Sequence, residues 1–577
     1  MTTLALDIEV YKDYFLIVFG GGGKFRHYEM YEGHPLTARP IRGLMESNRT
    51  ISFNGIRYDL PILTLALEGA SCDELYRASQ KIIVDDVPWW KIAKPPKRWD
   101  HVDIKEVAPG VAVSLKLYGG RMNSKWLQDL PIHPDESIAP DQRELMIEYC
   151  QNDVTTTLEL HGILTPQLEL RERMSLQYSQ NLMSKSDAQI AEAVLVAEVG
   201  GDVTRPKIPK EPSRYRAPMW MGFHTVALQE LFNDVLGAEF TVDKNGKLKM
   251  PPTLHNRKVE IGGTTYKLGV GGLHSQEKKV AHISTPDARV IDVDVASYYP
   301  SIILEQGLYP EQCGKKFLEV YRSIVERRLK AKASGDKTTA DSLKITINGS
   351  FGKLGSSYSK LYAPNLFKQV TVTGQLALLM LIEDLVGHGI PVVSGNTDGV
   401  VTRPSDEQLP LLRECVEWWE MLTGYDMEYT EYSGLYSRDV NNYLAVKMDG
   451  SSKGKGAMAV GGLMKNPVTP IIAKSVQEFL VSGVPIADTI RSGNVTDYLT
   501  VRTVKGGGQW RDGYLGKVVR WYWSTGGEPI RYVTNGNKVA TSDGAKPMMT
   551  LTDLPDDIDY DKYEAKAAEV LKGLGYV

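Results

Sequence analysis

Hydrophobic and polar positions along the chain repeat with two periods, and these periods predict the secondary structure. Short apolar runs, some of them alternating with polar residues, predict strands, whereas apolar residues spaced three and four apart predict helices. In the first part of the chain, to about residue 185, the pattern predicts strands at 3–9, 14–19 and 50–53 and helices at 61–67 and 137–159. Strands that alternate with helices in this way are typical of an α/β domain.

Residues 200–290 have a different pattern, with many Pro and Gly residues between short apolar runs. Frequent Pro and Gly residues predict short strands and loops, so we expect a connecting or inserted region. The chain then continues with a predicted strand and several predicted helices: a strand at 289–295, and helices at 315–333, 339–352 and 374–385. The last segment, from about residue 431, mixes β-like runs with Gly-rich turns and ends in a predicted helix at 560–574.

Length and composition narrow the class of protein. The chain has 577 residues, which suggests three or four domains of roughly 100–200 residues each. Hydrophobic content of 42% and charged content of 24% are those of a soluble globular protein. No apolar stretch approaches the ~20 residues that span a bilayer, and the N-terminus lacks a basic segment before its apolar part. We therefore expect neither a membrane span nor a signal peptide.

Cysteines and charge add two further expectations. The four cysteines lie far apart, without a CxxC pair or a His at ligand spacing, which argues against zinc, iron–sulfur and disulfide sites and suits a reducing cytoplasm. Net charge is −4, yet 315–353 holds ten Lys/Arg against four Asp/Glu. This segment suggests a local site for a polyanion. A solvated charged helix is the alternative, and charge alone favours it.

Three groups of acidic residues stand out in the first part of the chain. Asp7 and Glu9 fall on one face of a predicted strand. Asp59 precedes Leu-Pro, where an N-cap is the default explanation. Tyr149 and Asp153 are four residues apart on a predicted helix and share one face. Each group alone also has an ordinary explanation: solvent exposure at a strand end, a helix cap, and an exposed polar pair.

The order of these groups resembles that of DEDDy 3′–5′ exonucleases. The resemblance assigns four carboxylates to two Mg²⁺ ions: Asp7, Glu9, Asp59 and Asp153. One metal lowers the pKa of the attacking water and the other stabilises the leaving 3′-oxygen. In this family pattern Tyr149 orients the water and Asn54 contacts DNA. Segments 114–116, which ends in Lys116, and 125–131 are also similar to this domain in phage polymerases.

A second resemblance begins at Asp294. The run Asp294-Val-Ala-Ser-Tyr-Tyr299-Pro-Ser-Ile-Ile resembles the DxxSLYPSII motif of family-B DNA polymerases. Asp292 shares a strand face with Asp294, but the register of the motif selects Asp294. The resemblance implies that Asp294 and the Val295 carbonyl bind metal, that Ser297 lies in the nucleotide site, and that Tyr299 excludes a 2′-hydroxyl.

Lys344-Ile-Thr-Ile-Asn-Gly-Ser-Phe-Gly352 matches the family pattern KxxxNSxYG, with Gly349 for Ser and Phe351 for Tyr. On a helix, Lys344, Asn348 and Phe351 share one face. An antiparallel helix before it presents two cations four residues apart. The resemblance implies nucleotide binding by five residues: Arg328, Lys332, Lys344, Asn348 and Phe351. Gly352 allows a close backbone approach to DNA.

The stretch SGNTDGVV, residues 394–401, fits the YxDTDS turn of the same family. Asn-Thr-Asp-Gly is also good hairpin-turn chemistry by itself. Only the second acid of the family turn is present, as Asp398, and Asn396 takes the place of the first. The resemblance implies that Asp398 joins Asp294 in holding two metal ions and that Thr397 contacts DNA.

Weaker matches complete this pattern. Gly271 and Gly272 resemble the YxGG contact to the template strand, without its Tyr, and Tyr443 falls in the KxY motif with Asn441 in place of Lys. We expect Lys453 or Lys455 to supply the missing positive charge. Cations interleaved with aromatics further on suit a thumb that grips duplex phosphates, and a plain folded β-region is the alternative: Arg502, Lys505, Arg511, Lys517 and Arg520, with Trp510, Trp521 and Tyr522.

The resemblance covers 3–160 and 265–460 and implies an RNase H-like exonuclease domain followed by a right-hand polymerase domain. The expected parts are the exonuclease at 1–185, a connecting region of unknown role at 186–288, palm at 289–310, fingers at 311–355, palm at 356–435, and thumb with the C-terminal region at 436–577. The chain starts almost at the exonuclease motif, and about fifty residues separate motif A from Lys344. These features favour a bacteriophage enzyme without the strand-displacement insertion of the protein-primed group.

The expected function is therefore DNA-directed DNA synthesis from dNTPs with 3′–5′ proofreading in phage replication. Two Mg²⁺ ions are expected in each site, and Mn²⁺ can substitute. Expected partners are a DNA primer-template, dNTPs, and phage or host helicase, primase and single-strand binding protein. We expect a monomer in the host cytoplasm, with no membrane contact. The alternative is a DEDD exonuclease whose polymerase half has decayed into a DNA-binding platform. The departures at Asn396, Gly349 and Asn441 favour it slightly, and the intact motif residues disfavour it strongly: Asp294, Tyr299, Lys344, Asn348 and Asp398.

Overall fold

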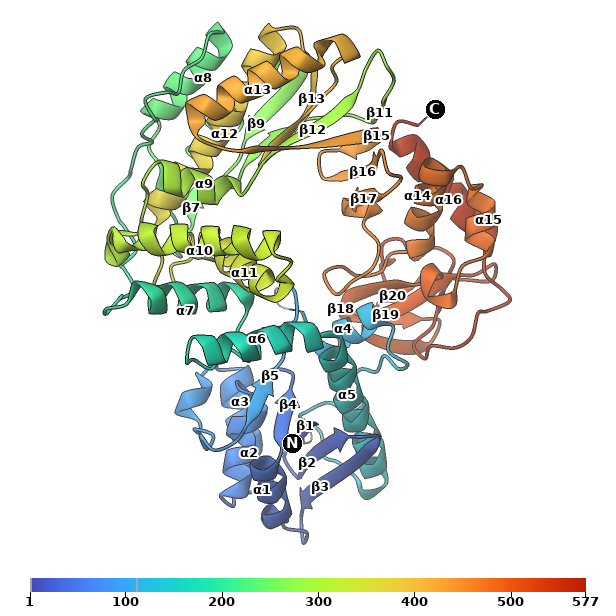
Figure 1. The fold of residues 1–577 in the computed structure, drawn as a ribbon. Helices are drawn as coiled ribbons and strands as arrows, with labels where there is room; N and C mark the ends of the chain where they lie inside the picture. Colours follow the sequence, from blue (N-terminus) through green and yellow to red (C-terminus); the bar gives the residue numbers. More distant parts are fainter. Residues whose placement is uncertain (1–2, 111–112, 577) are drawn as a thin grey trace. The chain divides into compact units, whose positions relative to one another are not determined.

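The computed structural model describes residues 3–110 and 113–576, and the chain forms two compact units (Figure 1). The first unit comprises Met1–Ser186, Gly461–Ile471 and Ile490–Tyr563, and the second comprises Asp187–Val460, Ile472–Thr489 and Glu564–Val577. Both units mix helices and sheets, so the predicted multidomain α/β and α+β architecture is confirmed. Part of the C-terminal segment thus belongs to the first unit.

The first unit is built on a five-stranded sheet with the order β3-β2-β1-β4-β5. Strands β1 and β2 are antiparallel, whereas β1, β4 and β5 run parallel. Its strands are β1 (Thr3–Val10), β2 (Tyr14–Gly21), β3 (Lys24–Tyr31), β4 (Arg49–Ser52) and β5 (His101–Asp103). Its helices are α1 (Ala38–Ser47), α2 (Asp59–Leu67), α3 (Cys72–Ile83), α4 (Leu115–Met122), α5 (Arg143–Ile163) and α6 (Thr165–Gln177). Helix α5 therefore begins later than predicted.

Alternation along β1 gives this sheet two apolar faces. Ala5 packs with the apolar side of α5, while Leu6 and Ile8 pack with α1, α2 and α3. The sheet is therefore covered on both sides by helices, as expected for parallel strands that must bury both faces. Asp7 and Glu9 interrupt this pattern on the α5 side.

The C-terminal part of the first unit is a second sheet with the order β20-β18-β19-β21. Its strands are β18 (Thr500–Trp510), β19 (Gly513–Trp523), β20 (Arg531–Tyr532) and β21 (Ala545–Pro547). Arg520 and Trp521 on β19 are fully buried. The Arg520 guanidinium donates to the Ser124 carbonyl at 2.7 Å and to the Met548 carbonyl at 2.7 Å. The prediction that Arg520 and Trp521 grip duplex DNA is therefore wrong, because Arg520 is used to join two segments of the fold.

The second unit is built on a ten-stranded sheet whose main path is β17-β16-β15-β12-β14-β13-β10-β9-β8. Its strands are β8 (Lys258–Ile261), β9 (Thr264–Leu268), β10 (Leu273–Ser275), β11 (Val280–Ile283), β12 (Val290–Val295), β13 (Val392–Asn396), β14 (Gly399–Thr402), β15 (Met427–Asp439), β16 (Asn442–Lys447) and β17 (Ser452–Lys455), and β6 (Thr241–Val242) and β7 (Leu248–Lys249) form a separate pair. Strand β12 lies in the middle of the path. It carries the predicted motif-A aspartates.

The helices of this unit are α7 (Asp187–Val199), α8 (Val226–Gly237), α9 (Tyr298–Glu305), α10 (Lys316–Ala333), α11 (Lys337–Leu354), α12 (Pro364–Gly387) and α13 (Leu409–Thr423). Helices α14 (Pro470–Ser482), α15 (Ile486–Arg491) and α16 (Tyr560–Gly573) follow in the chain. The prediction of only short strands and loops at 200–290 is wrong at α8. Three strands of this region, β8, β9 and β10, instead extend the large sheet.

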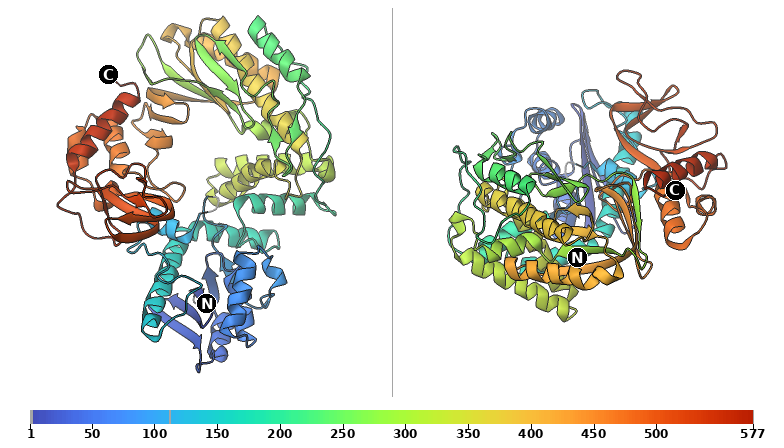
Figure 2. Two further views of the ribbon diagram at one scale, coloured as in Figure 1. Left: turned by 180° about the vertical axis from the view of Figure 1, so that it is seen from behind. Right: turned by 90° about the horizontal axis from the view of Figure 1, so that it is seen from above.

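Helix α12 is longer than the helix predicted at 374–385. It has 24 residues and a mean hydropathy of 1.5 over its most apolar window, enough in length and composition to cross a membrane. In the structure 83% of that window is buried inside the protein, and α12 packs against α9 and α13. Figure 2 shows α12 alongside the large sheet from two directions. Its apolar character is thus that of a core helix.

Candidate active sites

In the second unit, β12 and the β13–β14 hairpin bring two aspartates of the sequence motifs together. Asp294 pairs with Gly399 across the strands, and the Val295 amide donates to the Asp398 carbonyl at 2.8 Å. A Cβ atom on Gly399 would lie 1.8 Å from an Asp294 carboxylate oxygen. Only glycine therefore leaves room for that carboxylate beside the turn. Thr397 has a left-handed φ of +53°, which sharpens the bend that carries Asp398.

A polar cavity of about 240 Å³ lies beside these strands. Its walls include four acids and two cations: Glu277, Asp292, Asp294, Asp398, Lys453 and Lys455. Burial, together with the charges of Asp292 and Asp398, raises the pKa of the Asp294 carboxyl, whereas Lys453 lowers it. Asp292 accepts a hydrogen bond of 2.6 Å from the Tyr432 hydroxyl. A cluster of partly buried carboxylates of this kind favours a bound cation.

The two lysines come from β17, which pairs with β16. Lys455 stands opposite Tyr443 in the antiparallel register, and its ammonium lies 5.7 Å from the centre of the Tyr443 ring. Tyr443 lines the same cavity. The expectation that a lysine after the Asn441 position brings positive charge to Tyr443 is therefore confirmed.

The predicted nucleotide-site aromatics also come together. Tyr299 on α9 stacks on Phe351 of α11, with ring centres 4.2 Å apart. The Tyr299 hydroxyl donates to the Gly271 carbonyl. A Cβ on Gly272 would lie 2.8 Å from the Thr397 hydroxyl, so Gly272 allows its backbone to pack against Thr397. Four separated motifs thus meet in one place.

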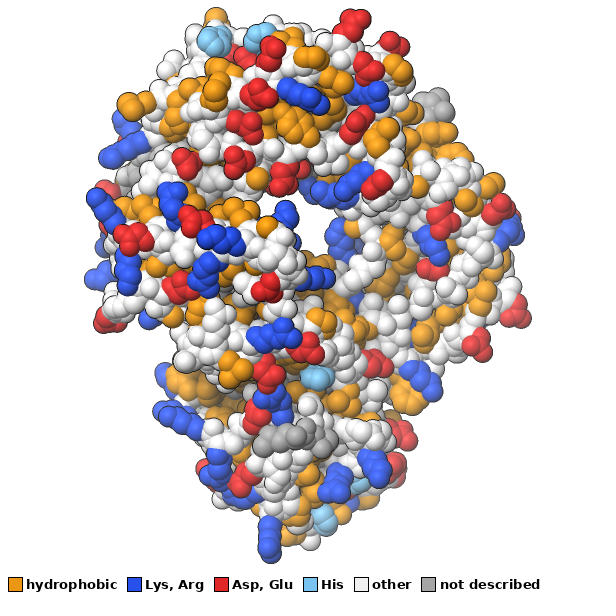
Figure 3. Space-filling model, in the orientation of Figure 1, with side chains coloured by type: hydrophobic (Ala, Val, Ile, Leu, Met, Phe, Trp, Pro, Cys, Tyr) orange, Lys and Arg blue, Asp and Glu red, His pale blue; other side chains and the backbone are white. Residues whose placement is uncertain are grey.

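The cationic residues of the fingers segment lie on α10 and α11. Arg328 donates to the Ser297 hydroxyl at 3.2 Å, which places it at the N-terminus of α9. Lys332, Lys344 and Asn348 are exposed, and so is Gly352. Lys and Arg side chains outnumber acids on the visible face over these two helices (Figure 3). Lys332, Lys344 and Asn348 are thus free to contact a ligand.

Asn396 ends β13. It pairs across strands with His274, and its side-chain oxygen accepts from the Thr397 hydroxyl at 3.1 Å. Asn396 lines the cavity together with the aspartates. The amide therefore holds the turn without adding a negative charge.

In the first unit, β1 carries Asp7 and Glu9, whose ligand oxygens lie within 4.8 Å of each other and of the Cys150 sulfur. The Cys150 thiol donates to an Asp7 carboxylate oxygen at 3.7 Å. Burial raises the pKa of Asp7 and of Glu9, and the neighbouring acids Asp59 and Asp153 raise both further. Four carboxylates are therefore close enough to repel one another.

Asp59 is 3% exposed and is the first residue of α2. Tyr58 occupies the N-cap position, and no side-chain cap bond forms there. The N-cap explanation of Asp59 is therefore wrong. Burial raises the pKa of Asp59, and its carboxylate accepts a hydrogen bond from the Ile8 amide, which directs it towards β1 between Asp7 and Glu9.

Lys116 supplies the cation of this first site. Its ammonium lies 3.3 Å from both carboxylate oxygens of Asp153 and 4.2 Å from the centre of the Tyr149 ring. It also lowers the pKa of Asp7 and of Glu9. Burial and the nearby acids raise the pKa of the Tyr149 hydroxyl well above its usual value, so Tyr149 stays protonated. In the sequence, Lys116 stands out only as part of a segment similar to the exonuclease domain. Its ion pair with Asp153 shows that it also balances charge in the carboxylate cluster.

Asn54 lies in the loop between β4 and α2 and has a left-handed φ of +74°. Its amide N–H donates to Asp103 at 2.9 Å, and its side-chain oxygen accepts from Lys105 at 2.8 Å. These bonds fix the loop before α2. The predicted DNA contact of Asn54 stays a prediction.

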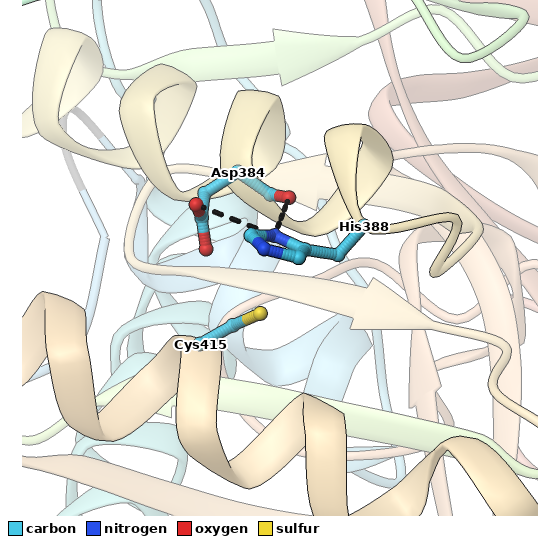
Figure 4. A group of neighbouring side chains, drawn as sticks. All are labelled: Asp384, His388 and Cys415. Atoms are coloured by element: carbon cyan, nitrogen blue, oxygen red, sulfur yellow. Dashed lines mark hydrogen bonds and ion pairs between the residues drawn. The ribbon is translucent and has the colours of Figure 1, made fainter.

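Asp384, His388 and Cys415 form another group of metal-ligand type, on α12 and α13 (Figure 4). His388 is the C-cap residue of α12, and its ring nitrogen Nδ1 bonds to the Asp384 carbonyl at 2.9 Å. The buried Cys415 thiol hydrogen-bonds to the Asp384 carboxylate, and burial and Asp384 raise its pKa to about 12. These bonds satisfy the three side chains and tie the end of α12 to α13.

Sequence patterns gave no sign of Glu277 or Tyr432, which also line the large cavity. Glu277 accepts from the Ser275 hydroxyl at 2.6 Å and from the Ser437 hydroxyl at 3.5 Å. Burial raises its pKa, and these serines oppose that rise. Both residues reach the cavity through strand pairing between distant segments, which no local motif reports.

Comparisons with known proteins point to one class. No protein-family model matches the chain. The chain is 30% identical over 124 residues to DNA polymerase 1 of Sulfurisphaera ohwakuensis, a match that covers 20% of this chain and 13% of that protein. It is 26% identical over 163 residues to DNA polymerase II of Escherichia coli K12, covering 22% of this chain and 21% of that protein. The chain thus matches about a fifth or less of the length of these curated relatives.

Among solved structures, the chain is similar to the family B DNA polymerase from the hyperthermophilic archaeon Pyrobaculum calidifontis, with a TM-score of 0.42 and 15% identity. That similarity covers 100% of this chain and 78% of the other. All three proteins are DNA polymerases by name.

Proposed function

We propose that the chain is a family-B DNA-directed DNA polymerase with 3′–5′ exonuclease activity, of bacteriophage type. One observation carries the proposal. Asp294, Asp398, Tyr299 and Phe351 come from three separate sequence motifs, and in the second unit the two aspartates line one polar cavity while the two rings stack on each other. Sequence similarity to DNA polymerases supports the polymerase part of the proposal.

The donor set suits Mg²⁺. Asp294 and Asp398 offer hard oxygen ligands, burial and the charges of Asp292 and Asp398 raise the pKa of Asp294, and Gly399 leaves room for the carboxylate. In the proposed site these two aspartates and the Val295 carbonyl would hold the ions. Bound Mg²⁺ lowers the pKa of the primer 3′-hydroxyl and neutralises charge on the transferred phosphate.

The protein's own side chains would bind and align the nucleotide. Lys344 on α11, with Arg328 and Lys332 on α10, offers cations to the triphosphate. The Tyr299 ring is held by Phe351 and by the Gly271 carbonyl. A fixed ring under the sugar leaves no space for a 2′-hydroxyl, so the site would select dNTPs.

In the first unit, Asp7, Glu9, Asp59 and Asp153 would hold two Mg²⁺ ions, with Mn²⁺ as a substitute at both sites. Burial and the neighbouring acids raise the pKa of Asp7 and of Glu9, and Lys116, which pairs directly with Asp153, opposes that rise; this arrangement supports a bound cation. The protonated Tyr149 hydroxyl would orient the attacking water. This chemistry removes a mispaired 3′-nucleotide.

The proposed setting is phage DNA replication in the cytoplasm of an infected bacterium. A primer-template would contact Tyr443, Thr397, Gly271, Gly272, Gly352 and Asn54. Helicase, primase and single-strand binding protein are the proposed partners of a monomeric enzyme. The proposed parts are those of the sequence analysis: exonuclease, connecting region, palm, fingers and thumb.

Primer extension tests the proposal. The purified wild-type chain, with Mg²⁺ and a labelled primer-template, is expected to extend the primer when dNTPs are present and to shorten it when they are absent. Asp398→Ala should lose extension and keep degradation. A wild type that only degrades would instead support the exonuclease with a decayed polymerase half, which the Asn396 departure favours.

A further inference from the structure

Helix α7 lies along α11 and beside α10 (Figures 1 and 2). The two helices approach closely at Gly349 of α11. A Cβ atom there would lie 2.8 Å from the Ala191 Cβ, 2.9 Å from the Asp187 carbonyl oxygen and 3.1 Å from the Ala188 Cα. Two of these three atoms are backbone, so no side-chain rotation relieves the clash. The helices pack this closely because position 349 is glycine.

Ion pairs hold α7 against α11 and α10 on the C-terminal side of this contact. Glu192 of α7 lies 3.3 Å from the Lys353 ammonium of α11, and their side chains are 19% and 17% exposed. Glu192 also accepts from the Lys360 amide at 3.1 Å. Glu198, further along α7, pairs with Arg327 of α10 at 3.0 Å. Removing one partner of a largely buried pair leaves an uncompensated charge, so these pairs oppose displacement of α7.

The same helix α11 presents the proposed nucleotide-binding residues. Asn348 directly precedes Gly349, and Lys344 lies five residues before it; both side chains are exposed. Phe351 follows two residues later and stacks on Tyr299. A helix is stiff over one or two turns, since each residue is tied by a backbone bond to the fourth residue before it. A displacement of α11 at Gly349 therefore moves Asn348 and Phe351 as well.

We propose that α7 is a brace that sets the position of α11, and that Gly349 is a positioning residue for the incoming nucleotide. The inference rests on the proposed polymerase function and deepens it. It gives a physical reason for the departure from KxxxNSxYG at position 349: a serine side chain would push α7 away. It also gives a structural role to the start of the segment 186–288.

Gly349→Ala tests the brace by steady-state kinetics of primer extension. We expect the KM for dNTP to rise about tenfold, since displacements near 1 Å cost up to a hundredfold, while the KM for primer-template stays as in the wild type. Adding Ala191→Gly removes the 2.8 Å contact and should restore part of the loss. Ala197→Leu, on the exposed face of the same helix, is the matched control and should leave both constants unchanged.

A second variant covers the case in which Gly349→Ala does not fold, as judged by thermal unfolding. Glu192→Gln keeps the shape of the side chain and removes its charge, and it should raise the KM for dNTP in the same direction. An unchanged KM for dNTP in a folded Gly349→Ala chain overturns the proposal, and so does an equal loss for dNTP and primer-template. A wild type without extension would instead overturn the polymerase function itself.

Discussion

The two carboxylate sites differ in how their negative charge is balanced. In the first unit, two acids of β1 lie close to one acid from α2 and one from α5, and Lys116 lies 3.3 Å from both oxygens of Asp153. In the second unit, Asp294 and Asp398 share a cavity of about 240 Å³ with Lys453 and Lys455 on its wall. The first site thus carries a directly paired ammonium, and the second offers volume and cations to a large anion.

This difference fits the two proposed reactions. A hydrolytic site has to position one phosphodiester and one water, so a tight acidic cluster is sufficient. A polymerase site has to admit a triphosphate and a primer end together, and both carry several negative charges. Cations beside the acids then reduce repulsion of the incoming groups.

The largest expected effect is the loss of exonuclease activity while primer extension is retained. Asp7→Ala should reduce degradation of single-stranded DNA by more than about 100-fold, since even indirect changes at metal sites cost 10- to 100-fold. Primer extension should remain within about twofold of wild type, because Asp7 belongs to the first unit. Both rates are measured on the same preparation. A parallel loss of extension would show that the sites are not independent.

Substitution of Tyr299 tests nucleotide selection in the second site. Tyr299→Ala removes the ring that stacks on Phe351 and should lower discrimination between dNTP and rNTP by at least about tenfold. Competition of the two nucleotides for one primer gives the ratio. Tyr299→Phe is the matched control, because it keeps the ring and loses only the bond to Gly271. Unchanged discrimination in Tyr299→Ala would show that the assigned register of this motif is wrong.

Substitutions of the β17 lysines, Lys453 and Lys455, test what the polar cavity of the second unit binds. Lys453→Ala with Lys455→Ala should weaken primer-template binding and reduce the slope of log affinity against log salt by about 1 for each lysine. Fluorescence anisotropy of a labelled primer-template at several salt concentrations measures the slope. Lys447→Ala, exposed at the other end of the same hairpin, is the control. An unaltered slope in the double variant would remove these lysines from the DNA site.

Acid stability offers a smaller test, confined to the first unit. His101 on β5 lies between the Thr50 and Ser52 hydroxyls at 2.9 Å each, and burial lowers its pKa to about 3. The unfolded chain takes up this proton near pH 6.5 and the folded chain does not. The free energy of unfolding therefore falls as the pH drops from 6.5 towards 3, by up to about 1.4 kcal/mol per unit from this group. Between pH 7 and 5, urea unfolding should show a smaller decrease in the free energy of unfolding for His101→Gln than for the wild type. Equal decreases in the two proteins would contradict this prediction.

Local patterns predicted much of the fold and of both sites, for physical reasons. Strand β1 and helices α10 and α11 carry strong periodicity, and the motif aspartates sit at strand ends that the pairing of β12 with β14 necessarily brings together. Helix α8 was missed because Pro- and Gly-rich flanks outweighed its short apolar pattern. The predicted DNA contact of Arg520 is wrong because the sequence does not reveal that this side chain is buried. Glu277 and Tyr432 depend on long-range pairing, which leaves no local signal.

Asn396 gives the smallest expected effect. Asn396→Asp would add a carboxylate to a cavity whose walls already hold four acids, Asp294 and Asp398 among them, and the Thr397 hydroxyl can donate to either side chain. The turn should therefore persist, and extension at saturating Mg²⁺ should stay within about threefold of wild type, an effect near 0.6 kcal/mol. The added charge should increase the Mg²⁺ dependence of the rate, since more negative charge then needs a cation. Titration of Mg²⁺ for both proteins measures this, with Asn441→Asp as a control outside the turn. A loss beyond a hundredfold would mean that the open site tolerates no further charge and that Asn396 is required for activity.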